Sequence, residues 1–383
     1  MTNGTAYEKL AATLRKQVKA GQVGEDGFVA SEVDLTRQHG ISRVTVRRAV
    51  DDLVEERLVQ RRPGKGLYVR KDDPDKVKKV WLILDNIGRE SFAQFFRAAQ
   101  RMAKEFNFDV QLKDGLSETG ENLRLLAELA GRDDVDGALI IAWHKPEFFE
   151  AIFAIKKHGI PFVLLDHHNA QMSFPSVVAD NYRGGWLVAE HLYALGHRQF
   201  AFMGAHSAVT IQKRLAGFRD YLAERGVALP ASQILEVSPD DYFHGWERVV
   251  DRKLSLLFEG RAVGAQLKSK GRSVARAPSK ALSLKPQTPT ALFASCDRTA
   301  QEVFRWCSDQ NISIPGDLSV VGFDNEPVSK ALKLTTVSQP FAEMGTKAMI
   351  LLNAQIEGKP WNGRELTLPV ELVIRRSTQE RKA

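Results

Sequence analysis

The sequence contains few cysteines and no long apolar run, and each absence excludes a class of protein. Only Cys296 and Cys307 occur among 383 residues, which is too few for a disulfide framework and suits a reducing compartment. No apolar run reaches the roughly 18 residues that a membrane-spanning helix needs. The segment Met1–Leu10 has neither a basic leader nor an apolar stretch, so no secretory signal is expected. We therefore expect a cytoplasmic protein with no membrane segment.

Acidic residues are absent from residues 261–285, which contain seven Lys and Arg. Residues 1–72 are also basic, with 14 Lys and Arg against 10 Asp and Glu. The formal net charge of the whole chain is only +7, which is less than the sum of the two basic regions. The rest of the chain is therefore mildly acidic, and the two basic regions favour a polyanionic partner. A chain of 383 residues is too long for one ordinary domain, so two or three units are expected.

The first 70 residues are predicted to form three short helices and a β-hairpin. Apolar residues at helical spacing predict the first helix. Ser31 is placed to cap a second helix that ends before Gly40, and Ser42 is placed to cap a third. The predicted elements are helices over residues 6–20, 32–38 and 43–57, and strands over 59–62 and 67–70.

A short helix, a glycine turn and a second helix form a helix-turn-helix, whose second helix enters the major groove of DNA by its N-terminal end. The apolar stripe that begins at Val46 turns Arg43 and Arg47 to the outward face. An arginine there can form two hydrogen bonds to a guanine edge, and Val44 and Thr45 can contact a thymine methyl group or a phosphate. A solvated basic helix of another small domain would carry similar charges. The capped helices, the hairpin and the charge together favour DNA.

Three motifs in this region carry a family resemblance: SRVTVRRAV at 42–50, LVEERLV at 53–59 and PGKGLYV at 63–69. The segment from Tyr7 to Val69 resembles the GntR-type winged helix. This chain has Val33 where that family usually has an arginine, which puts the contact made there in doubt. The contacts to DNA that the resemblance implies come from the start of the third helix and from the wing tip: Ser42, Arg43, Thr45, Arg47, Gly64 and Lys65.

Residues 71–79 are polar, contain a proline and have no periodicity, which predicts a linker. After them, apolar strands alternate with helices, as in parallel sheets that helices cover on both faces. This alternation alone leaves open whether there is one large sheet or two lobes. The expected strands are 80–85, 137–142, 162–166, 199–204, 291–296 and 318–323, and the expected helices are 91–106, 121–131, 147–158, 184–195, 213–225, 243–258 and 298–310.

Carboxylates follow three of these strands, at Asp166, Asp297 and Asp324. Ligands of parallel α/β folds gather at the carboxyl ends of the strands, where carboxylates can accept hydrogen bonds from hydroxyl groups. Arg214, on a predicted helix, could donate several hydrogen bonds to the same ligand. An aspartate at the end of a strand can equally cap the next helix. Spacing alone leaves both interpretations open.

Five segments between residues 79 and 375 carry a second resemblance: IPFVLLD at 160–166, VVADNYRGGWLVAEHLYALGHR at 177–198, KRLAGFRDYL at 213–222, PGDLSVVGFDN at 315–325 and LTTVSQPF at 334–341. They are similar, in the same order, to the effector domain of the LacI/GalR family, which shares its fold with periplasmic sugar-binding proteins. The resemblance implies two lobes joined by three crossovers, with the effector between them. The ligand contacts that it implies are Asp166, Thr210, Arg214, Asp324, Gln339 and Phe341, with residues 85–92 lining the first lobe.

The resemblances together imply an N-terminal α+β winged helix-turn-helix (1–70), a linker (71–79) and a two-lobed α/β domain of the type I periplasmic-binding-protein-like fold (80–383). A GntR-type head on such a body resembles the architecture of the arabinose repressors of bacilli, which implies a carbohydrate-responsive repressor. We expect a homodimer that presents two heads to a pseudo-palindromic operator and releases it when ligand binds. A corepressor or an activator stays open. Cys296 stands where the family commonly has asparagine, so an ordinary hexose effector is less secure.

Two other function classes also fit parts of the sequence. A periplasmic binding protein would share the large domain, but it would need a signal peptide and no DNA-binding head. A sugar-modifying enzyme would need a catalytic constellation, and none is evident, so we expect no enzymatic activity and no cofactor. The histidines at 167, 168, 191 and 197 do not form a structural-zinc pattern, so no metal site is expected.

The basic stretch within residues 260–288 is not covered by the family resemblance. It separates the helix predicted over 243–258 from the strand predicted over 291–296, which normally follow one another closely. Its few aliphatic residues are scattered, so it would bury too little apolar area to offset the entropy of ordering the chain. The composition therefore predicts a disordered surface insertion. A second, non-specific contact with DNA is the alternative interpretation.

Overall fold

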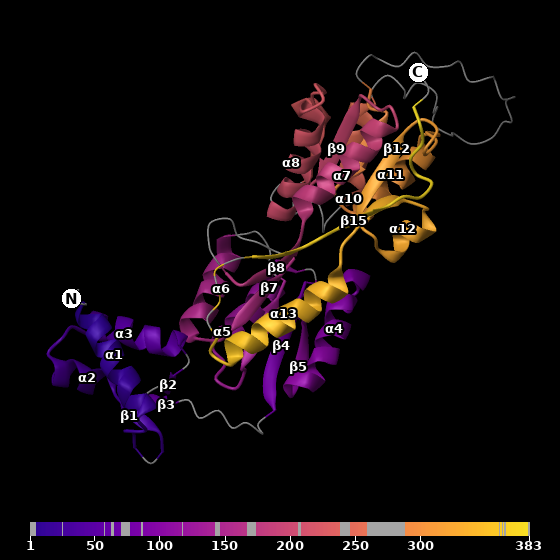
Figure 1. The fold of residues 1–383 in the computed structure, drawn as a ribbon. Coiled ribbons are helices and arrows are strands. Elements are labelled where there is room, and N and C mark those ends of the chain that lie inside the picture. Colours follow the sequence, from indigo (N-terminus) through magenta and orange to yellow (C-terminus); the bar gives the residue numbers. More distant parts are fainter. Residues whose placement is uncertain are drawn as a thin grey trace, which may run out of the picture.

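The computed structural model describes residues 5–24, 26–56, 58–62, 65–69, 77–85, 87–116, 118–141, 146–166, 174–205, 208–237, 246–258, 288–359, 361, 363 and 365–381. Three bodies follow one another along an elongated molecule: an N-terminal head, a first lobe and a second lobe (Figure 1). The N-terminus lies in the head, and the C-terminus lies at the far end of the second lobe. Within the described residues, no helix is both long and apolar enough to cross a membrane.

The head contains the three predicted helices and the predicted hairpin. Ser31 accepts a hydrogen bond from the backbone N–H of Asp34, and Ser42 accepts one from that of Thr45, so both predicted caps are confirmed. Gly40 ends the second helix at φ 63°, in the left-handed region that favours glycine. The elements are α1 (Ala6–Lys19), β1 (Phe28–Ala30), α2 (Glu32–His39), α3 (Arg43–Glu55), β2 (Val59–Arg62) and β3 (Gly66–Val69).

One strand of the head was not predicted. The strand β1 pairs antiparallel with β3, so the hairpin becomes a three-stranded sheet in the order β1-β3-β2. Only three residues belong to β1, which is too few for an alternating pattern to be read from the sequence. The core of the head joins Leu10 and Leu14 of α1 to Leu35 of α2 and to the apolar stripe of α3.

The large domain contains two sheets of six strands, so two lobes rather than one sheet are present. The first-lobe sheet has the order β14-β8-β7-β6-β4-β5, and the second-lobe sheet has the order β10-β9-β11-β12-β13-β15. All pairs are parallel except β13 with β15. The strands are β4 (Lys78–Leu84), β5 (Phe108–Asp114), β6 (Gly137–Ile140), β7 (Phe162–Leu165), β8 (Ser176–Ala179), β9 (Phe200–Gly204), β10 (Ile234–Glu236), β11 (Ala291–Ala294), β12 (Ser319–Asp324), β13 (Thr335–Ser338), β14 (Leu366–Leu368) and β15 (Glu371–Val373).

Helices cover both faces of each sheet, as the strand–helix alternation predicted. In the first lobe, α4 and α13 pack on one face and α5 and α6 on the other; in the second lobe, α7 and α8 pack opposite α10 and α11. The helices are α4 (Glu90–Phe106), α5 (Thr119–Ala130), α6 (Pro146–His158), α7 (Asn181–Ala194), α8 (Val209–Ala223), α10 (Trp246–Leu257), α11 (Asp297–Asp309), α12 (Pro327–Ala331) and α13 (Phe341–Ile356).

The chain passes between the lobes three times: from β8 to α7, from β13 to α13 and from β14 to β15. These crossovers confirm the topology that the family resemblance implied. The boundary between the predicted linker and the first strand differs from the prediction. The first strand begins at Lys78 rather than at residue 80, so the predicted linker 71–79 is shorter at its end. Residues 70–76, and all of the predicted insertion except residue 288, lie outside the described residues.

Candidate DNA-reading face and ligand cleft

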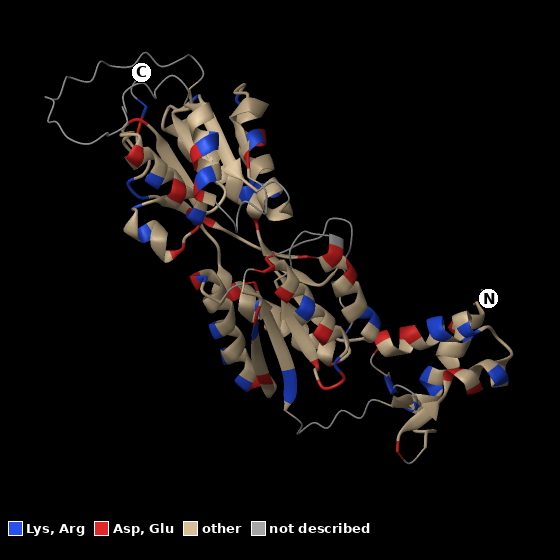
Figure 2. Ribbon diagram, turned by 180° about the vertical axis from the view of Figure 1, so that it is seen from behind, with Lys and Arg blue, Asp and Glu red and all other residues tan. Residues whose placement is uncertain are grey.

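The N-terminal half of α3 presents the predicted DNA-contacting side chains to solvent. Val46, on the inward stripe, is fully buried, whereas Val44 is 77% exposed and the Arg47 side chain is 64% exposed. Arg43 is also exposed. Lys and Arg residues lie on all three helices of the head (Figure 2). This arrangement of buried and exposed positions is the one that a recognition helix requires.

A carboxylate that sequence reasoning missed organises the charges beside this face. Glu32 accepts from Nε of Arg47 at 3.2 Å and from Nε of Arg61 at 3.1 Å. Arg61 also pairs with Asp51 at 2.7 Å. Exposed ion pairs of this kind contribute about 1 kcal/mol or less, so a phosphate or a guanine edge can replace the carboxylate. Glu32 is 15 residues from Arg47 in the sequence, and no local pattern joins the two.

The remaining predicted DNA contacts lie in the cap and the wing. The Ser42 and Thr45 hydroxyl groups are 2.8 Å apart and hydrogen-bonded to one another, which fixes the first turn of α3. Lys65 is exposed at the end of the hairpin. Gly64, the other predicted wing-tip residue, lies outside the described residues.

Where the two lobes face one another, in what we call the cleft, polar side chains gather around Arg214 of α8. Its side chain is only 5% exposed. Nε donates to Oδ1 of Asn181 at 2.7 Å, and Nη1 donates to the Ser295 carbonyl at 2.5 Å. The guanidinium lies 3.7 Å from the centre of the Phe323 ring and 3.6 Å from Oδ1 of Asp324. These contacts hold the charge in one position.

Close packing of α7 on α8 makes this position possible. A Cβ atom at Gly185 of α7 would lie 1.8 Å from the backbone oxygen of Arg214. Only glycine lets the two helices approach this closely. The approach brings Asn181, at the start of α7, within hydrogen-bond distance of the arginine. Asn181 was not identified from the sequence, although it lies within the segment 177–198 that carries the family resemblance.

Asp324 and Gln339 bind one another at the ends of neighbouring strands. Nε2 of Gln339 donates to Oδ1 of Asp324 at 2.7 Å. Asp324 has φ 110°, a backbone conformation that side-chain-bearing residues rarely adopt. Burial raises the pKa of Asp324 to about 7, although the charge of Arg214 opposes the shift. Strain and burial at one carboxylate are typical of a functional site.

Asp166 lies near the same group of charges from the first lobe. Burial raises its pKa to about 6, and the charge of Arg214 acts in the opposite direction. The charge of Asp166 in turn raises the pKa of Asp324. Oδ1 of Asp166 and Oε1 of Gln339 are buried, and neither has a hydrogen-bond partner among the described residues. Both atoms are acceptors, so both require a donor that a ligand can supply.

The other two predicted ligand contacts have weaker support from the geometry. Thr210 is buried one helical turn before Arg214 on α8. Phe341, the first residue of α13, is 3% exposed and packs edge-to-face on Phe95 of α4, with ring centres 5.4 Å apart. Both residues lie at the cleft ends of their helices. Their contact with ligand stays a prediction.

Asp297 has structural hydrogen-bond partners, but it does not cap the next helix: it is the first residue of α11, which has no side-chain hydrogen bond at its cap. Its carboxylate accepts from the Thr336 hydroxyl at 2.5 Å and from the Glu326 backbone N–H at 2.8 Å. Burial raises its pKa to about 8. Glu326 also accepts a hydrogen bond from Ser91 of the first lobe at 2.9 Å, which links the two lobes directly. The Cys296 thiol is buried beside Thr299.

Models of known families match the chain in three stretches. Residues 6–69 match the bacterial regulatory proteins of the gntR family. Residues 78–243 match the periplasmic binding proteins and sugar binding domain of the LacI family, and residues 189–378 match a periplasmic binding protein-like domain. These matches correspond to the head and to the two-lobed domain.

Relatives extend the likeness to the whole chain. The arabinose metabolism transcriptional repressor of Halalkalibacterium halodurans is 26% identical over 398 residues, covering 99% of this chain and 98% of the relative. A LacI family regulator of Enterococcus faecalis with bound ribose is 28% identical, with a TM-score of 0.61, over 80% of this chain and all of that one. The regulator CelR in complex with cellobiose shares the fold over 98% of this chain and all of its own, at 21% identity and a TM-score of 0.63. The chain thus joins a gntR-family DNA-binding domain to a periplasmic-binding-protein-like effector domain of the LacI type.

Proposed function

We propose that this protein is a cytoplasmic repressor of transcription that binds operator DNA as a homodimer and releases it when a neutral sugar binds between the lobes. The observation that carries the proposal is the pair of buried acceptors, Asp166 Oδ1 and Gln339 Oε1, beside the fixed guanidinium of Arg214. A ligand with several hydroxyl groups can donate to both acceptors and accept from the arginine. The sugar-bound structures of related regulators support this ligand class.

The DNA contacts follow from the geometry of α3. Arg43 and Arg47 reach base edges in the major groove, and Val44 and Thr45 contact the bases or phosphates between them. Ser42 and the wing residues Gly64 and Lys65 contact the phosphate backbone, which supplies affinity but no sequence information.

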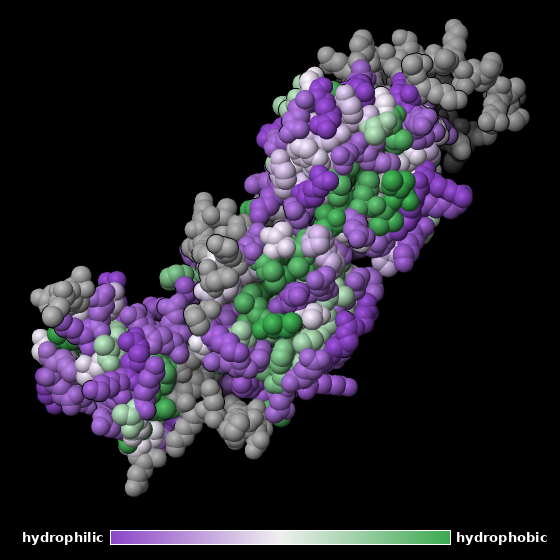
Figure 3. Space-filling view, in the orientation of Figure 1, coloured by the Kyte–Doolittle hydropathy of each residue, from purple (hydrophilic) through white to green (hydrophobic). Residues whose placement is uncertain are grey.

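The homodimer doubles the short sequence that one head can read, and a two-fold dimer matches a pseudo-palindromic operator. Apolar side chains gather on the face of the first lobe formed by α13 and on part of the second lobe (Figure 3). Ile350 of α13 is 45% exposed and Ile374, next to β15, is 63% exposed. Exposed apolar residues on both lobes support a partner on this face.

A thermal-shift screen tests the proposal. Arabinose, ribose, cellobiose and other mono- and disaccharides are added to the full chain, alone and with a duplex selected from a random pool. We expect one sugar to raise the melting temperature and to weaken binding to the selected duplex. Binding that strengthens with sugar would make the ligand a corepressor. Stabilisation with turnover of the sugar would instead favour an enzyme.

A further inference from the structure

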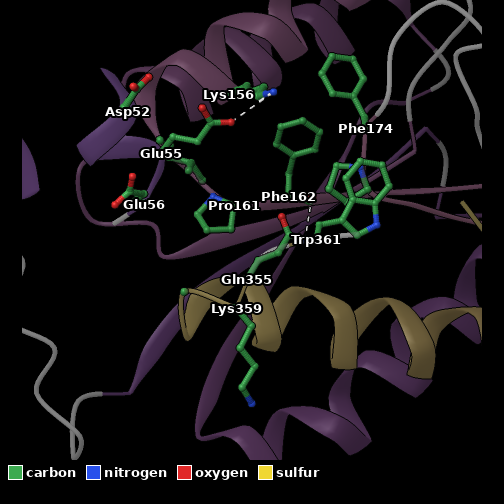
Figure 4. Close-up of a pocket in the computed structure, with 14 residues that line it drawn as sticks. Asp52, Glu55, Glu56, Lys156, Pro161, Phe162, Phe174, Gln355, Lys359 and Trp361 are labelled. Atoms are coloured by element: carbon green, nitrogen blue, oxygen red, sulfur yellow. Dashed lines mark hydrogen bonds and ion pairs between the residues drawn. The ribbon is translucent and has the colours of Figure 1, made fainter. Parts of the chain in front are cut away.

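The head packs against the first lobe through the C-terminal end of α3, opposite the end that reads DNA. Val54 of α3 contacts Gly159, just after α6; a Cβ at Gly159 would lie 2.6 Å from Val54 Cγ1. Gly159 also has φ +83°, so both the backbone conformation and the close approach of Val54 favour glycine at this position. Beside this contact, Lys156 Nζ lies 3.4 Å from Glu55 Oε1 (Figure 4). We call this contact region, Asp52–Glu56 against Lys156–Phe162, the head–lobe junction.

A cavity of about 450 Å³ adjoins the junction. Its walls combine carboxylates of α3 with aromatic side chains of the first lobe, and Figure 4 shows that the lining residues come from α3, α6, β7 and the end of α13. Space of this size beside the contact allows the head to shift without a clash against the lobe. The residues that line it include Asp52, Glu55, Glu56, Phe162, Phe174 and Trp361.

The helix α3 is a rigid connection between the junction and the DNA-reading face. Its 13 residues span roughly 20 Å at 1.5 Å per residue. Arg43 and Arg47 lie at one end, and Val54 and Glu55 lie at the other. Arg15 of α1 donates to Glu56 at 2.7 Å, which fastens the junction end of α3 to the rest of the head. A shift at the junction therefore turns the whole head.

Two elements of the first lobe connect the junction to the ligand cleft. The strand β7 begins at Phe162, which lines the junction cavity, and ends directly before Asp166. The helix α13 begins at Phe341, a predicted ligand contact, and Gln355 near its other end lines the same cavity. Nε2 of Gln355 donates to the Phe162 carbonyl at 3.3 Å, which joins the two elements at the junction. Both elements thus have a predicted ligand contact at one end and the head at the other.

We propose that the head–lobe junction transmits ligand occupancy of the cleft to the recognition helix. The inference rests on the proposed function, because it requires a ligand in the cleft. A ligand that draws in Asp166 and Phe341 displaces α13 and β7, the latter together with β6 and β8, with which it pairs. The far ends of these elements move the surface on which α3 rests. The operator then meets heads in an altered orientation and is released.

Charge reversal at the junction tests this route. The sugar among arabinose, ribose and cellobiose that most weakens wild-type binding to the selected duplex serves as the probe. Lys156→Glu places two carboxylates together and should reduce the sugar-induced change in duplex affinity at least threefold. The double variant Lys156→Glu with Glu55→Lys should restore it. Lys157→Glu, with the same charge change on an exposed neighbour, is the matched control and should respond like the wild type.

A tether across the junction gives a second measurement. Cysteines introduced as Glu55→Cys and Lys156→Cys can be joined by a short bismaleimide, while the two native cysteines are buried. The tethered protein should bind the duplex within threefold of the wild type but lose at least nine-tenths of its sugar response. The pair Glu55→Cys with Lys157→Cys, blocked with a monofunctional maleimide, should keep its response.

The outcomes separate the two proposals. A wild type that ignores every sugar overturns the proposed function, and the junction route with it. A wild type that responds, together with a Lys156→Glu variant and a tethered protein that respond equally well, overturns the junction route alone. Sugar affinity measured by calorimetry without DNA should be unchanged in Lys156→Glu and Lys157→Glu, because neither residue lies in the proposed ligand site. The tethered protein should bind sugar more weakly, because coupling between two sites is reciprocal.

Discussion

The head and the cleft each contain an arginine paired with a carboxylate, but the two pairs differ in exposure. The side chains of Arg47 and Glu32 in the head are 64% and 25% exposed, whereas those of Arg214 and Asp324 in the cleft are 5% and 15% exposed. Water screens the first pair, so it contributes about 1 kcal/mol or less. The second pair lies where charges are costly unless each is fully hydrogen-bonded.

The difference suits two different ligands. DNA supplies its own negative charge, so a weak internal pair in the head can be exchanged for a phosphate or a base edge at little cost. A neutral ligand cannot replace a charge, so the cleft holds its arginine with four contacts and offers acceptors that lack donors. In the head, a ligand would replace an internal ion pair; in the cleft, a ligand would bind beside an ion pair that stays in place.

Removal of the cleft arginine should have the largest effect. Arg214→Ala leaves Asp324 buried without its counter-charge and leaves Asn181 Oδ1 without its donor. We expect loss of sugar binding and a decrease of about 3–5 kcal/mol in the free energy of unfolding. Calorimetric titration and denaturant unfolding measure the two effects.

Arg219→Ala is the matched control, because Arg219 lies on the same helix with its side chain 56% exposed. It should change the free energy of unfolding by less than about 0.5 kcal/mol and leave sugar binding intact. If Arg214→Ala still bound sugar with wild-type affinity, the cleft would not be the ligand site.

Removal of the exposed arginines should have smaller effects, confined to DNA. Arg43→Ala or Arg47→Ala should cost about 1–3 kcal/mol of specific binding and relax one operator position. Lys65→Ala should weaken binding to all sequences evenly and flatten the dependence on salt. Duplex titrations at several salt concentrations, with single base-pair changes, distinguish these two patterns.

Arg37→Ala, an exposed arginine of α2 outside the predicted contact set, is the comparison for the DNA variants. Thermal melting should be alike in all four proteins, because the substituted side chains are exposed. Unchanged duplex affinity in Arg43→Ala, Arg47→Ala and Lys65→Ala would remove the helix-turn-helix assignment.

The pH dependence of stability should separate the buried carboxylates from the exposed ones. The folded-state pKa of Asp324 is raised to about 7, so the folded protein holds a proton that the unfolded chain has lost. The stability that Asp324 contributes is therefore complete below about pH 4, decreases as the pH rises and is lost once the pH has passed 7. The low pKa of His197, about 4 because of burial, acts oppositely but only below its ordinary value of 6.5. Denaturant unfolding between pH 6.5 and 8.5 therefore excludes the histidine and reports on the buried carboxylates, Asp324 and Asp297.

Over that range we expect Asp324 to contribute a decrease of about 0.8 kcal/mol in the free energy of unfolding. Asp324→Asn should remove this part of the decrease, and Asp297, whose pKa of about 8 lies inside the range, should account for a larger part, about 2 kcal/mol. Asp220→Asn, at a carboxylate 46% exposed on α8, should leave the slope unchanged. Equal slopes in the wild type and Asp324→Asn would mean that Asp324 is ionised throughout.

Sequence patterns predicted the elements whose buried and exposed faces are clear. The helices of the head, their serine caps and the six apolar strands were found in this way. The helix α13 was not, because Ile350 and the half-buried Leu351 interrupt its apolar stripe with the run MILL. The strand β13 was missed because Thr335 and Thr336 look polar. Both are fully buried; the Thr335 hydroxyl bonds to Thr378 near the C-terminus, and that of Thr336 donates to Asp297 of α11.

The spacing of residues in the sequence predicted less of the site than of the fold. The Arg214–Asp324 pair joins residues 110 positions apart, and the charge on Asp166 comes from the other lobe. Local patterns only placed each residue at the end of a strand or on a helix, and the family resemblance supplied their grouping. The Glu32–Arg47 pair had no signal of either kind.

Deletion of residues 261–285 should have the smallest effect of all, although the segment carries seven of the chain's Lys and Arg. The segment lies outside the described residues, but its attachment points do not. It connects the end of α10 to the start of β11, and β11 runs parallel to β9 and β12, whose carboxyl ends face the cleft. The start of β11 therefore lies at the opposite end of the second lobe, with both lobes between it and the head (Figure 1).

The attachment points are far from the reading face of the same chain, and Coulomb interactions in solution fall off within about 10 Å at ordinary ionic strength. We therefore propose that the deletion leaves melting, sugar response and duplex affinity at low salt unchanged. Replacement of the same Lys and Arg residues by Gln, with the length kept, serves as the control for any effect of shortening. A loss of duplex affinity in both proteins that disappears at high salt would show instead that the segment binds DNA directly. The chain would then have a third binding region, in addition to the head and the cleft, that acts through its charge alone.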